Sequence, residues 1–288
     1  MIIHQTITYF IEKFKPTAEF VIQYQQEYAI HFEEYFRYHC RQPEEKLKVA
    51  LTKYPEKLPD IVEINGKIVG LIEEVKAYYE MNYDITFEKD VHLIVGMYGS
   101  NAFTHRQINP EITFCLEKLS PKEEHLCVII SHEFGHALHN LLSDHVGMNW
   151  KELDWNHPYT WLLQEGSATY FSTKAVTTDD PSVYFTYDDD EEGWLRFAES
   201  NRDDILKAFQ ADLQVLSPTE LFREWFSING GTKFSKTRLA YYIGYHLLLF
   251  LIGKMGEQEA VTAWKRPDFH SIMSQTLEEL DNQWSING

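Results

Sequence analysis

The strongest constraint on the fold is a five-residue pattern, H-E-x-x-H, at residues 132–136. On an α-helix, residues four apart lie on one face, about 6 Å apart along the axis. His132 and His136 could therefore both reach one zinc ion at about 2.0–2.1 Å. Glu133 is offset by about 100° around the helix, so its carboxylate can miss the metal and hold a metal-coordinated water. Because so short a motif also arises by chance, the surrounding residues must show whether this one binds a metal.

The flanking sequence predicts a helix independently of the histidines. Ser120, Pro121 and Glu123 have the identities of a capping box with proline at the first helical position. The apolar residues that follow are spaced to give a wide, buried helix surface: Leu126, Ile129, Ile130, Phe134, Ala137, Leu138 and Leu141. We expect His139 to pack or to support a ligand rather than to bind metal itself.

A catalytic zinc site takes three protein ligands and keeps a fourth position open. A closely following third histidine is excluded, because position 142 is leucine. Glu165 lies in a second predicted helix, residues 161–170, and a carboxylate among apolar residues there suggests a cation. A solvated Glu165, or ligation by His145 or His157 from the intervening loop, remains the alternative.

The small residues Gly166, Ser167 and Ala168 indicate that this second helix approaches a neighbour closely. Near the C-terminus, residues 236–256 predict a strongly apolar helix that carries Tyr242, Tyr245 and His246. A tyrosine or histidine side chain can donate a hydrogen bond to an oxyanion that forms beside a metal. Packing of these tyrosines in the core is the competing interpretation.

The N-terminal part is predicted to be mostly helical. Residues 20–36 and 67–81 carry apolar side chains at helical spacing, although Asn65-Gly66 could instead form a hairpin turn. Prolines at 43, 55 and 59 predict short helices with turns between these segments. We interpret His4, His31 and His39 as surface or packing residues.

Two strands are predicted before the central helix, at residues 91–98 and 111–117. A strand edge there could accept an extended peptide as an additional strand, or the segment could be an ordinary meander. After the second helix, the acidic run 188–192 predicts a solvated loop or helix start, residues 194–216 a long amphipathic helix, and residues 227–232 a flexible loop.

The composition narrows the class of partner. The chain has 288 residues and a net charge of −18, which argues against nucleic acid or an anionic membrane surface as partner. Three cysteines without a C-x-x-C pair are typical of a reducing compartment. With no recognisable signal peptide and no apolar run long enough for a membrane span, we expect a soluble cytoplasmic protein.

The H-E-x-x-H motif followed by a helix reading E-G-x-A-T-Y resembles the gluzincin branch of the zincin metallopeptidases. The resemblance covers roughly residues 90–255 and is specific at four positions: His132, Glu133, His136 and Glu165. It implies Zn²⁺ bound by the two histidines and Glu165, with Glu133 as general base and a peptide or protein as substrate. The segment HEFGHALH is similar to the thimet-oligopeptidase motif, but the E-x-P-S-Q companion of that group is missing.

Two further segments resemble parts of this branch. Asn101 and Ala102 stand in a segment similar to the substrate-binding edge of thermolysin-like enzymes. The Y-x-G-Y sequence at Tyr242–Tyr245 resembles a recurring helix of predicted zinc-dependent protease families, which makes Tyr242 the first candidate for the oxyanion donor. One departure is Thr169, where thermolysin-like enzymes carry an acid, so the partner of a zinc histidine must come from elsewhere.

Together these features predict an α+β fold: a mostly helical, zincin-like chain with a small mixed sheet before the H-E-x-x-H helix. We expect a helical N-terminal part at 1–88, a catalytic core at 89–178 and a helical C-terminal part at 179–288. The expected activity is that of a zinc-dependent peptidase. The alternatives are a zinc-stabilised regulatory or structural protein, its fourth ligand being His139 or His157, and a protein without metal.

Overall fold

The computed structural model describes residues 1–189 and 193–287, and these residues pack as two compact units, 1–137 and 138–288. The boundary falls inside one continuous helix, α6 (Glu123–His145). Most of the described residues are helical and the strands form one small sheet, so the α+β prediction is confirmed at that level. None of the helices within the described ranges is long and apolar enough to cross a bilayer. The three-part division of the chain stays a prediction.

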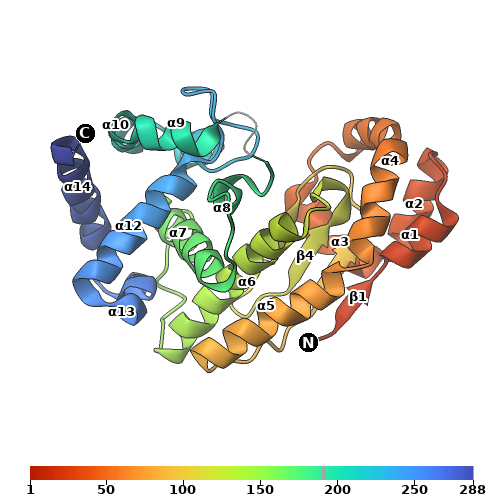
Figure 1. Ribbon diagram of the computed structural model, residues 1–288, viewed down its shortest axis with the longest axis horizontal. Coiled ribbons are helices and arrows are strands. Elements are labelled where there is room, and N and C mark those ends of the chain that lie inside the picture. Colours follow the sequence, from red (N-terminus) through yellow and green to blue (C-terminus); the bar gives the residue numbers. More distant parts are fainter. Residues whose placement is uncertain (190–192, 288) are drawn as a thin grey trace. The chain divides into compact units, whose positions relative to one another are not determined.

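The first unit is built around a mixed sheet with the strand order β1-β2-β4-β3 (Figure 1). Strands β1 (Ile3–Gln5), β2 (Val91–Ile94) and β4 (Ile112–Cys115) are parallel, and β3 (Ala102–Thr104) runs antiparallel to β4 at the edge. The predicted mixed sheet is thus confirmed, with two additional strands, β1 and β3, that the sequence did not reveal.

Helices surround this sheet in the first unit. They are α1 (Ile7–Lys13), α2 (Ala18–Glu27), α3 (Ala29–Glu34), the π-helix η1 (Tyr35–His39), α4 (Pro43–Asn65), α5 (Ile68–Tyr83), the 3₁₀-helix η2 (Leu116–Lys118) and the first part of α6. Residues 67–81 are therefore helical, and the alternative hairpin at Asn65-Gly66 is excluded. Helix α6 begins at Glu123, two residues later than predicted.

The prediction of short helices with turns at residues 41–60 is wrong, because α4 is one helix of 23 residues with Pro55 and Pro59 inside it. Proline removes one backbone donor and crowds the preceding turn. The two prolines are four apart, so they share one face, and both are exposed. Water can therefore solvate the carbonyls left without a helical partner, while the opposite face buries Tyr54 and Ile61.

Strand β2 ends at Ile94, four residues before the predicted end, because side chains take over the hydrogen bonds of the following backbone. The N–H groups of Gly96 and Tyr98 donate to the two carboxylate oxygens of Glu117, at 2.8 and 3.0 Å. The hydroxyl of Tyr35 accepts from Met97 and Gly99. Burial raises the pKa of Glu117 to about 7.

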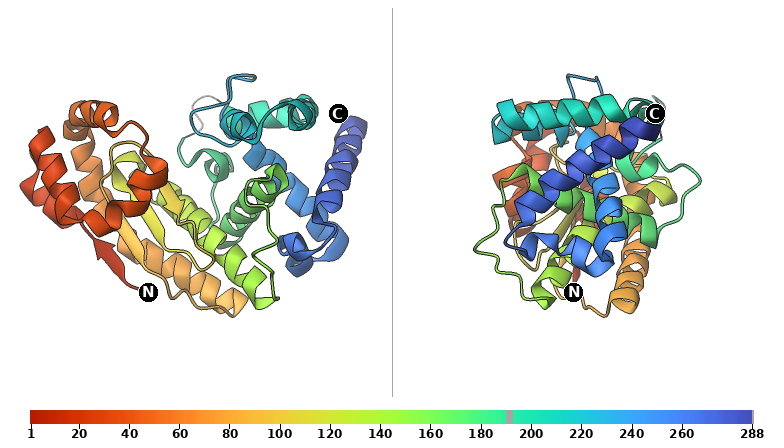
Figure 2. Two further views of the ribbon diagram at one scale, coloured as in Figure 1. Left: turned by 180° about the vertical axis from the view of Figure 1, so that it is seen from behind. Right: turned by 90° about the vertical axis from the view of Figure 1, so that its left-hand side faces the viewer.

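The second unit is helical in the part that the structure describes. After the last turns of α6 it contains α7 (Pro158–Ala175), α8 (Val183–Thr186), α9 (Trp194–Ser200), α10 (Arg202–Val215), α11 (Pro218–Trp225), α12 (Leu239–Met255), α13 (Glu257–Val261), the 3₁₀-helix η3 (Ala263–Lys265) and α14 (Phe269–Asn287). Helix α12 packs along α7 on one side and beside α14 on another (Figure 2).

Three C-terminal predictions can be compared with this arrangement. The single helix expected at 194–216 is wrong, because Asn201 separates α9 from α10. Residues 227–232 lie in the expected loop between α11 and α12. Of the acidic run 188–192, residues 190–192 lie outside the described residues, and 188–189 are in a loop.

Candidate metal centre

Helix α6 positions both histidines of the H-E-x-x-H pattern and the glutamate between them. His132 and Glu133 are buried, with 2% and 7% of their surface exposed, and His136 is half-buried. The imidazole rings of His132 and His136 lie 4.7 Å apart between centroids and are perpendicular. The pattern therefore forms the one-faced helical pair that its spacing predicts.

The position of α6 in the first unit is set by contacts on either side of His132. The hydroxyl of Tyr79, on α5, donates to the carbonyl of Ser131 at 3.0 Å. The ring of Phe87 packs edge-on against Phe134, with 4.9 Å between centroids. Ser131 and Phe134 are fully buried, so packing holds the part of α6 that carries the two histidines.

Thr104, at the end of edge strand β3, is a site residue that sequence reasoning missed. Its hydroxyl donates to the Glu133 carboxylate at 2.8 Å and lies 3.2 Å from the Glu133 carbonyl. Such a bond fixes the direction of the carboxylate and favours its ionised form. The sequence offered one signal for it: Thr104 lies two residues after Ala102, in the segment that was predicted to form a strand edge.

Glu165 lies on α7, as predicted, and is half-buried. His132 and His136, in the first unit, and Glu165, in the second, each offer one ligand atom that could hold a metal ion. Two imidazoles and a carboxylate are a donor set that zinc takes in three-ligand sites. The residues present thus fit a zinc ion.

The small residues of α7 provide a close helix contact, and the partner is α12. A Cβ atom on Gly244 of α12 would lie 2.6 Å from the carbonyl oxygen of Leu162, and one on Gly166 would collide with the Gly244 carbonyl. The two helices therefore touch backbone to backbone one residue away from Glu165. The sequence indicated a close approach at these residues but did not indicate α12 as the partner.

Tyr242 and His246 lie on a different side of α12 from Gly244. Each is two positions from Gly244, and residues two positions apart on a helix are separated by about 200°. Both side chains therefore point away from the contact with α7. Tyr242 is 3% exposed and packs against Phe185, His246 and Trp284, with 4.3 Å between its ring centroid and that of His246. This placement does not bring Tyr242 toward α7, and burial raises its pKa to about 12.

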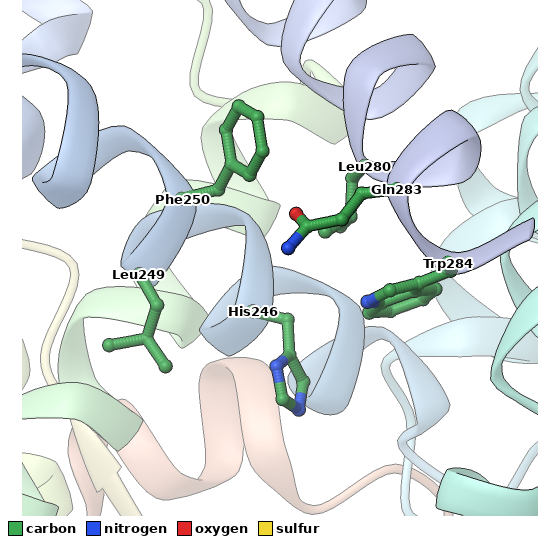
Figure 3. A pocket seen from close by; sticks show the side chains of 6 residues that line it. All are labelled: His246, Leu249, Phe250, Leu280, Gln283 and Trp284. Carbon is green, nitrogen blue, oxygen red and sulfur yellow. The ribbon is translucent and has the colours of Figure 1, made fainter. Parts of the chain in front are cut away.

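His246 lines a pocket of about 230 Å³ between α12 and α14 (Figure 3). The other lining residues are Leu249, Phe250, Leu280, Gln283 and Trp284. Burial lowers the pKa of His246 to about 4, so its ring is neutral near pH 7. Tyr245 packs edge-on against Phe185, 5.9 Å between centroids. The substrate-binding roles of Tyr245 and His246 stay predictions.

The outward backbone groups of Ala102, in the edge segment, are hydrogen-bonded to neighbouring side chains. In the register of β3 with β4, the backbone groups of Ala102 point outward, away from β4. The N–H of Ala102 donates to Asn101 Oδ1 at 2.9 Å, and its carbonyl accepts from the Ser100 hydroxyl at 3.0 Å. A peptide that adds to this edge must displace both contacts. The predicted binding role of Asn101 and Ala102 remains untested.

The alternative ligands His139 and His157 are used in packing. His139 is fully buried, stacks on Trp264 at 3.9 Å between centroids, and places Nε2 2.6 Å from the Val261 carbonyl. His157 caps α7 by accepting from the Tyr159 N–H at 3.1 Å and stacks on His270. Neither arrangement favours a fourth ligand from these residues.

Thr169, which replaces the expected acid on α7, is fully buried. Within the described residues its hydroxyl has no hydrogen-bond partner. A carboxylate at this position would carry a charge into the same buried environment. Because position 169 carries no carboxylate, the residue that orients a zinc-binding histidine must lie elsewhere.

Comparisons of the chain with protein-family models, with curated proteins and with solved structures found no match.

Proposed function

We propose that this chain is a zinc-dependent peptidase of the gluzincin type, with His132, His136 and Glu165 as metal ligands. The observation that carries the proposal lies within the first unit. The rings of His132 and His136 are 4.7 Å apart between centroids on α6, and the carboxylate of Glu133 between them is buried and accepts from the Thr104 hydroxyl. Glu165, on α7, offers the third ligand atom. A cytoplasmic location is part of the same proposal.

Zinc, when bound, would act as a Lewis acid and would lower the pKa of a coordinated water toward about 7. Glu133 then serves as general base: its carboxylate takes a proton from the attacking water and delivers it to the leaving amine. Thr104 holds this carboxylate in one direction through its hydroxyl. The extended substrate would lie along β3, beside Asn101 and Ala102.

The oxyanion donor is better assigned to Tyr241 than to Tyr242. Tyr241 lies three residues before Gly244, about 60° away around the helix, and so shares the face that packs on α7. Leu248 and Leu251, which follow on the same face, are fully buried, whereas Tyr241 is half-buried. Its phenol is therefore on the α7 side of α12, with part of its surface accessible.

The decisive test of the proposal is Glu133→Gln. The amide cannot accept the proton, so we expect hydrolysis of a peptide library to fall by at least about 1000-fold while bound zinc, measured by mass spectrometry, is unchanged. Glu123→Gln, an exposed change in the first turn of the same helix, is the matched control and should retain full activity. Full activity of Glu133→Gln would refute the mechanism.

A second comparison separates the two tyrosines. Tyr241→Phe removes only the phenolic hydroxyl, and we expect kcat to fall by about 10²-fold with KM little changed. Tyr242→Phe should retain near-normal kcat, because the Tyr242 ring is packed against Phe185 and Trp284. The reverse result would restore Tyr242 as the donor.

A further inference from the structure

A second group of histidines lies on the sheet of the first unit, on the face opposite Thr104. The register places His4, His92 and Thr113 side by side on neighbouring strands. Because side chains alternate along a strand, Glu111 and His105 point to this same face, whereas Thr104 points to the other face, toward Glu133. The histidines and Glu111 thus share one face of the sheet, and the face that carries Thr104 is turned toward α6.

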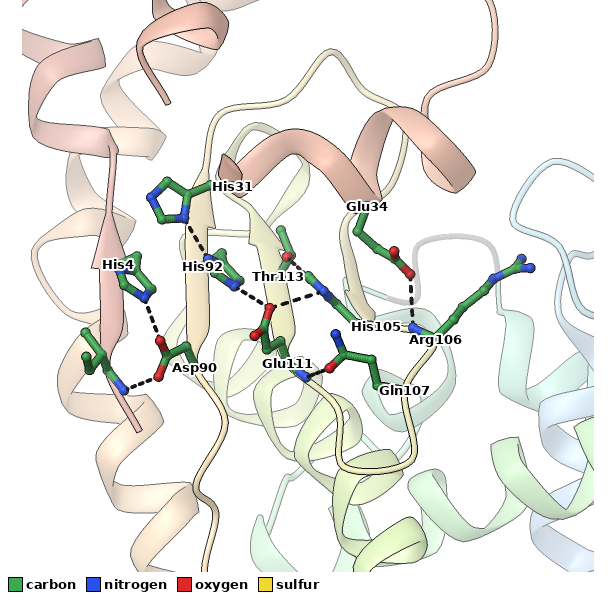
Figure 4. Close-up of polar contacts among 11 residues, drawn as sticks. His4, His31, Glu34, Asp90, His92, His105, Arg106, Gln107, Glu111 and Thr113 are labelled. Carbon is green, nitrogen blue, oxygen red and sulfur yellow. Dashed lines mark hydrogen bonds and ion pairs between the residues drawn. The ribbon is translucent and has the colours of Figure 1, made fainter. Parts of the chain in front are cut away.

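Three of these side chains converge on one point (Figure 4). Ligand atoms of His92, His105 and Glu111 all lie within 4.8 Å of one another. Glu111 Oε2 lies 3.1 Å from His92 Nε2 and 3.6 Å from His105 Nδ1. Adjacent ligand atoms of a tetrahedral zinc ion are about 3.3 Å apart, given bond lengths of about 2.0–2.1 Å. These two distances bracket that value.

The remote ring nitrogen of each histidine is also held. His105 Nε2 lies 2.7 Å from the Thr113 hydroxyl, and His92 Nδ1 lies 2.8 Å from His31 Nδ1. Hydrogen bonds to the remote nitrogen fix the orientation and tautomer of metal-binding histidines. His92 and His105 therefore have the outer contacts of metal ligands as well as the inner ones.

Burial distinguishes this group from a solvated surface cluster. The side chains of His92 and His105 are 8% and 10% exposed, and that of Glu111 is 32% exposed. The group is therefore enclosed on the sheet side and accessible beside Glu111. One carboxylate with two neutral imidazoles is a donor set for Zn²⁺ and for neighbouring divalent transition ions.

We propose that His92, His105 and Glu111 form a second binding site for a divalent transition-metal ion, independent of the H-E-x-x-H site. His31 and Thr113 orient the two histidines, and the side of the site next to Glu111 remains open for water or an exogenous ligand. The competing explanation is a purely structural hydrogen-bond network among the same residues. The two explanations differ in whether zinc binds there with one-to-one stoichiometry.

The experiment measures zinc by equilibrium dialysis and mass spectrometry on the full chain. We expect two zinc ions per wild-type chain and one in His132→Ala/His136→Ala. In that double variant, Glu111→Gln should weaken the remaining site at least about 100-fold, and Thr113→Val about 10-fold. Cobalt substitution supplies a second readout, because its visible spectrum reports the nitrogen and oxygen ligands of each site.

The matched control is Glu34→Gln. Glu34 lies near the group, where its carboxylate accepts from the Arg106 N–H at 3.0 Å, and it loses the same charge without supplying a ligand. Zinc binding should be unchanged in this variant. One ion in the wild type with none in His132→Ala/His136→Ala, or equal binding by Glu111→Gln and Glu34→Gln, would overturn the second site. Neither result alters the test of Glu133.

Discussion

At the scale of single residues, the Thr104–Glu133 hydrogen bond links the edge strand to the proposed base. Its 2.8 Å length and the burial of Glu133 make the contact a strong influence on the carboxylate. A hydrogen bond to an ionised group is worth about 1.5–3 kcal/mol. Thr104 therefore acts as a positioning residue: it sets the direction of the carboxylate and its readiness to accept a proton.

Thr104→Val keeps the shape of the side chain and removes the hydroxyl. We expect kcat/KM to fall about tenfold, since the base loses its fixed direction. Thr104→Ser retains the donor and should restore the wild-type value. A kcat/KM that Thr104→Val leaves unchanged would contradict the assigned role.

Some residues of the candidate sites were within reach of sequence reasoning and others were not. His132, Glu133, His136 and Glu165 were found because fixed helical spacing and a carboxylate in an apolar helix are local signals. Tyr242 was chosen from its local pattern without its direction relative to Gly244. The second histidine group was missed because its members come from different strands and a loop, and their meeting depends on strand register.

At the scale of elements, the Gly166–Gly244 contact holds α7 and α12 together beside Glu165. The approach is possible only because neither residue has a side chain. Glycine inside a helix costs about 1 kcal/mol relative to alanine. The packing at this contact must therefore stabilise the fold by more than the helix-propensity cost of the two glycines.

Gly244→Ala tests this contact. The new Cβ would meet backbone atoms of Leu162 and Gly166, which cannot move without separating the helices. We expect the free energy of unfolding, measured in urea, to fall by about 1–3 kcal/mol. Gly253, on the same helix, is exposed, and a methyl group added there would meet no neighbouring atom within 4 Å. Gly253→Ala should instead stabilise by up to about 1 kcal/mol, and equal effects of the two changes would disprove the packing argument.

The elements that sequence predicted well are those whose signals are periodic. Helices α5, α6, α7 and α12 follow their apolar spacing, and the helical pattern from 20 to 36 appears as α2 and α3. Helix α4 was broken into pieces in the prediction because exposure of Pro55 and Pro59 cannot be read from the sequence. Strand β1 was missed because three residues, paired with β2 far along the chain, carry no local signal.

At the scale of the whole molecule, each unit contains a half-buried histidine that must gain a proton during acid unfolding. Burial lowers the pKa of His39 in the first unit and of His246 in the second, each to about 4. Between pH 6.5 and 4 the unfolded chain therefore binds more protons than the folded chain. The contribution of these two histidines to the free energy of unfolding is fully present above pH 6.5 and is lost as the pH falls toward 4. Glu117, whose pKa is raised to about 7, acts in the opposite direction.

We expect the free energy of unfolding to be lower at pH 4.5 than at pH 6.5, with each histidine contributing up to about 2 kcal/mol of the difference. His39→Gln and His246→Gln should each flatten this dependence, as measured by urea titration at the two pH values. His145→Gln, at the exposed end of α6, is the control and should leave the slope unchanged. A slope that both buried-site variants leave intact would show that other groups control acid stability.

The closure of Ala102 by Ser100 and Asn101 has a consequence for the protein in concentrated solution. An open strand edge is a template on which a second copy can build, and this is a common start of aggregation. Here the outward donor and acceptor of Ala102 are already satisfied, and β3 is three residues long. A second copy that pairs at Ala102 would have to displace both contacts, which disfavours the start of an intermolecular sheet at that residue.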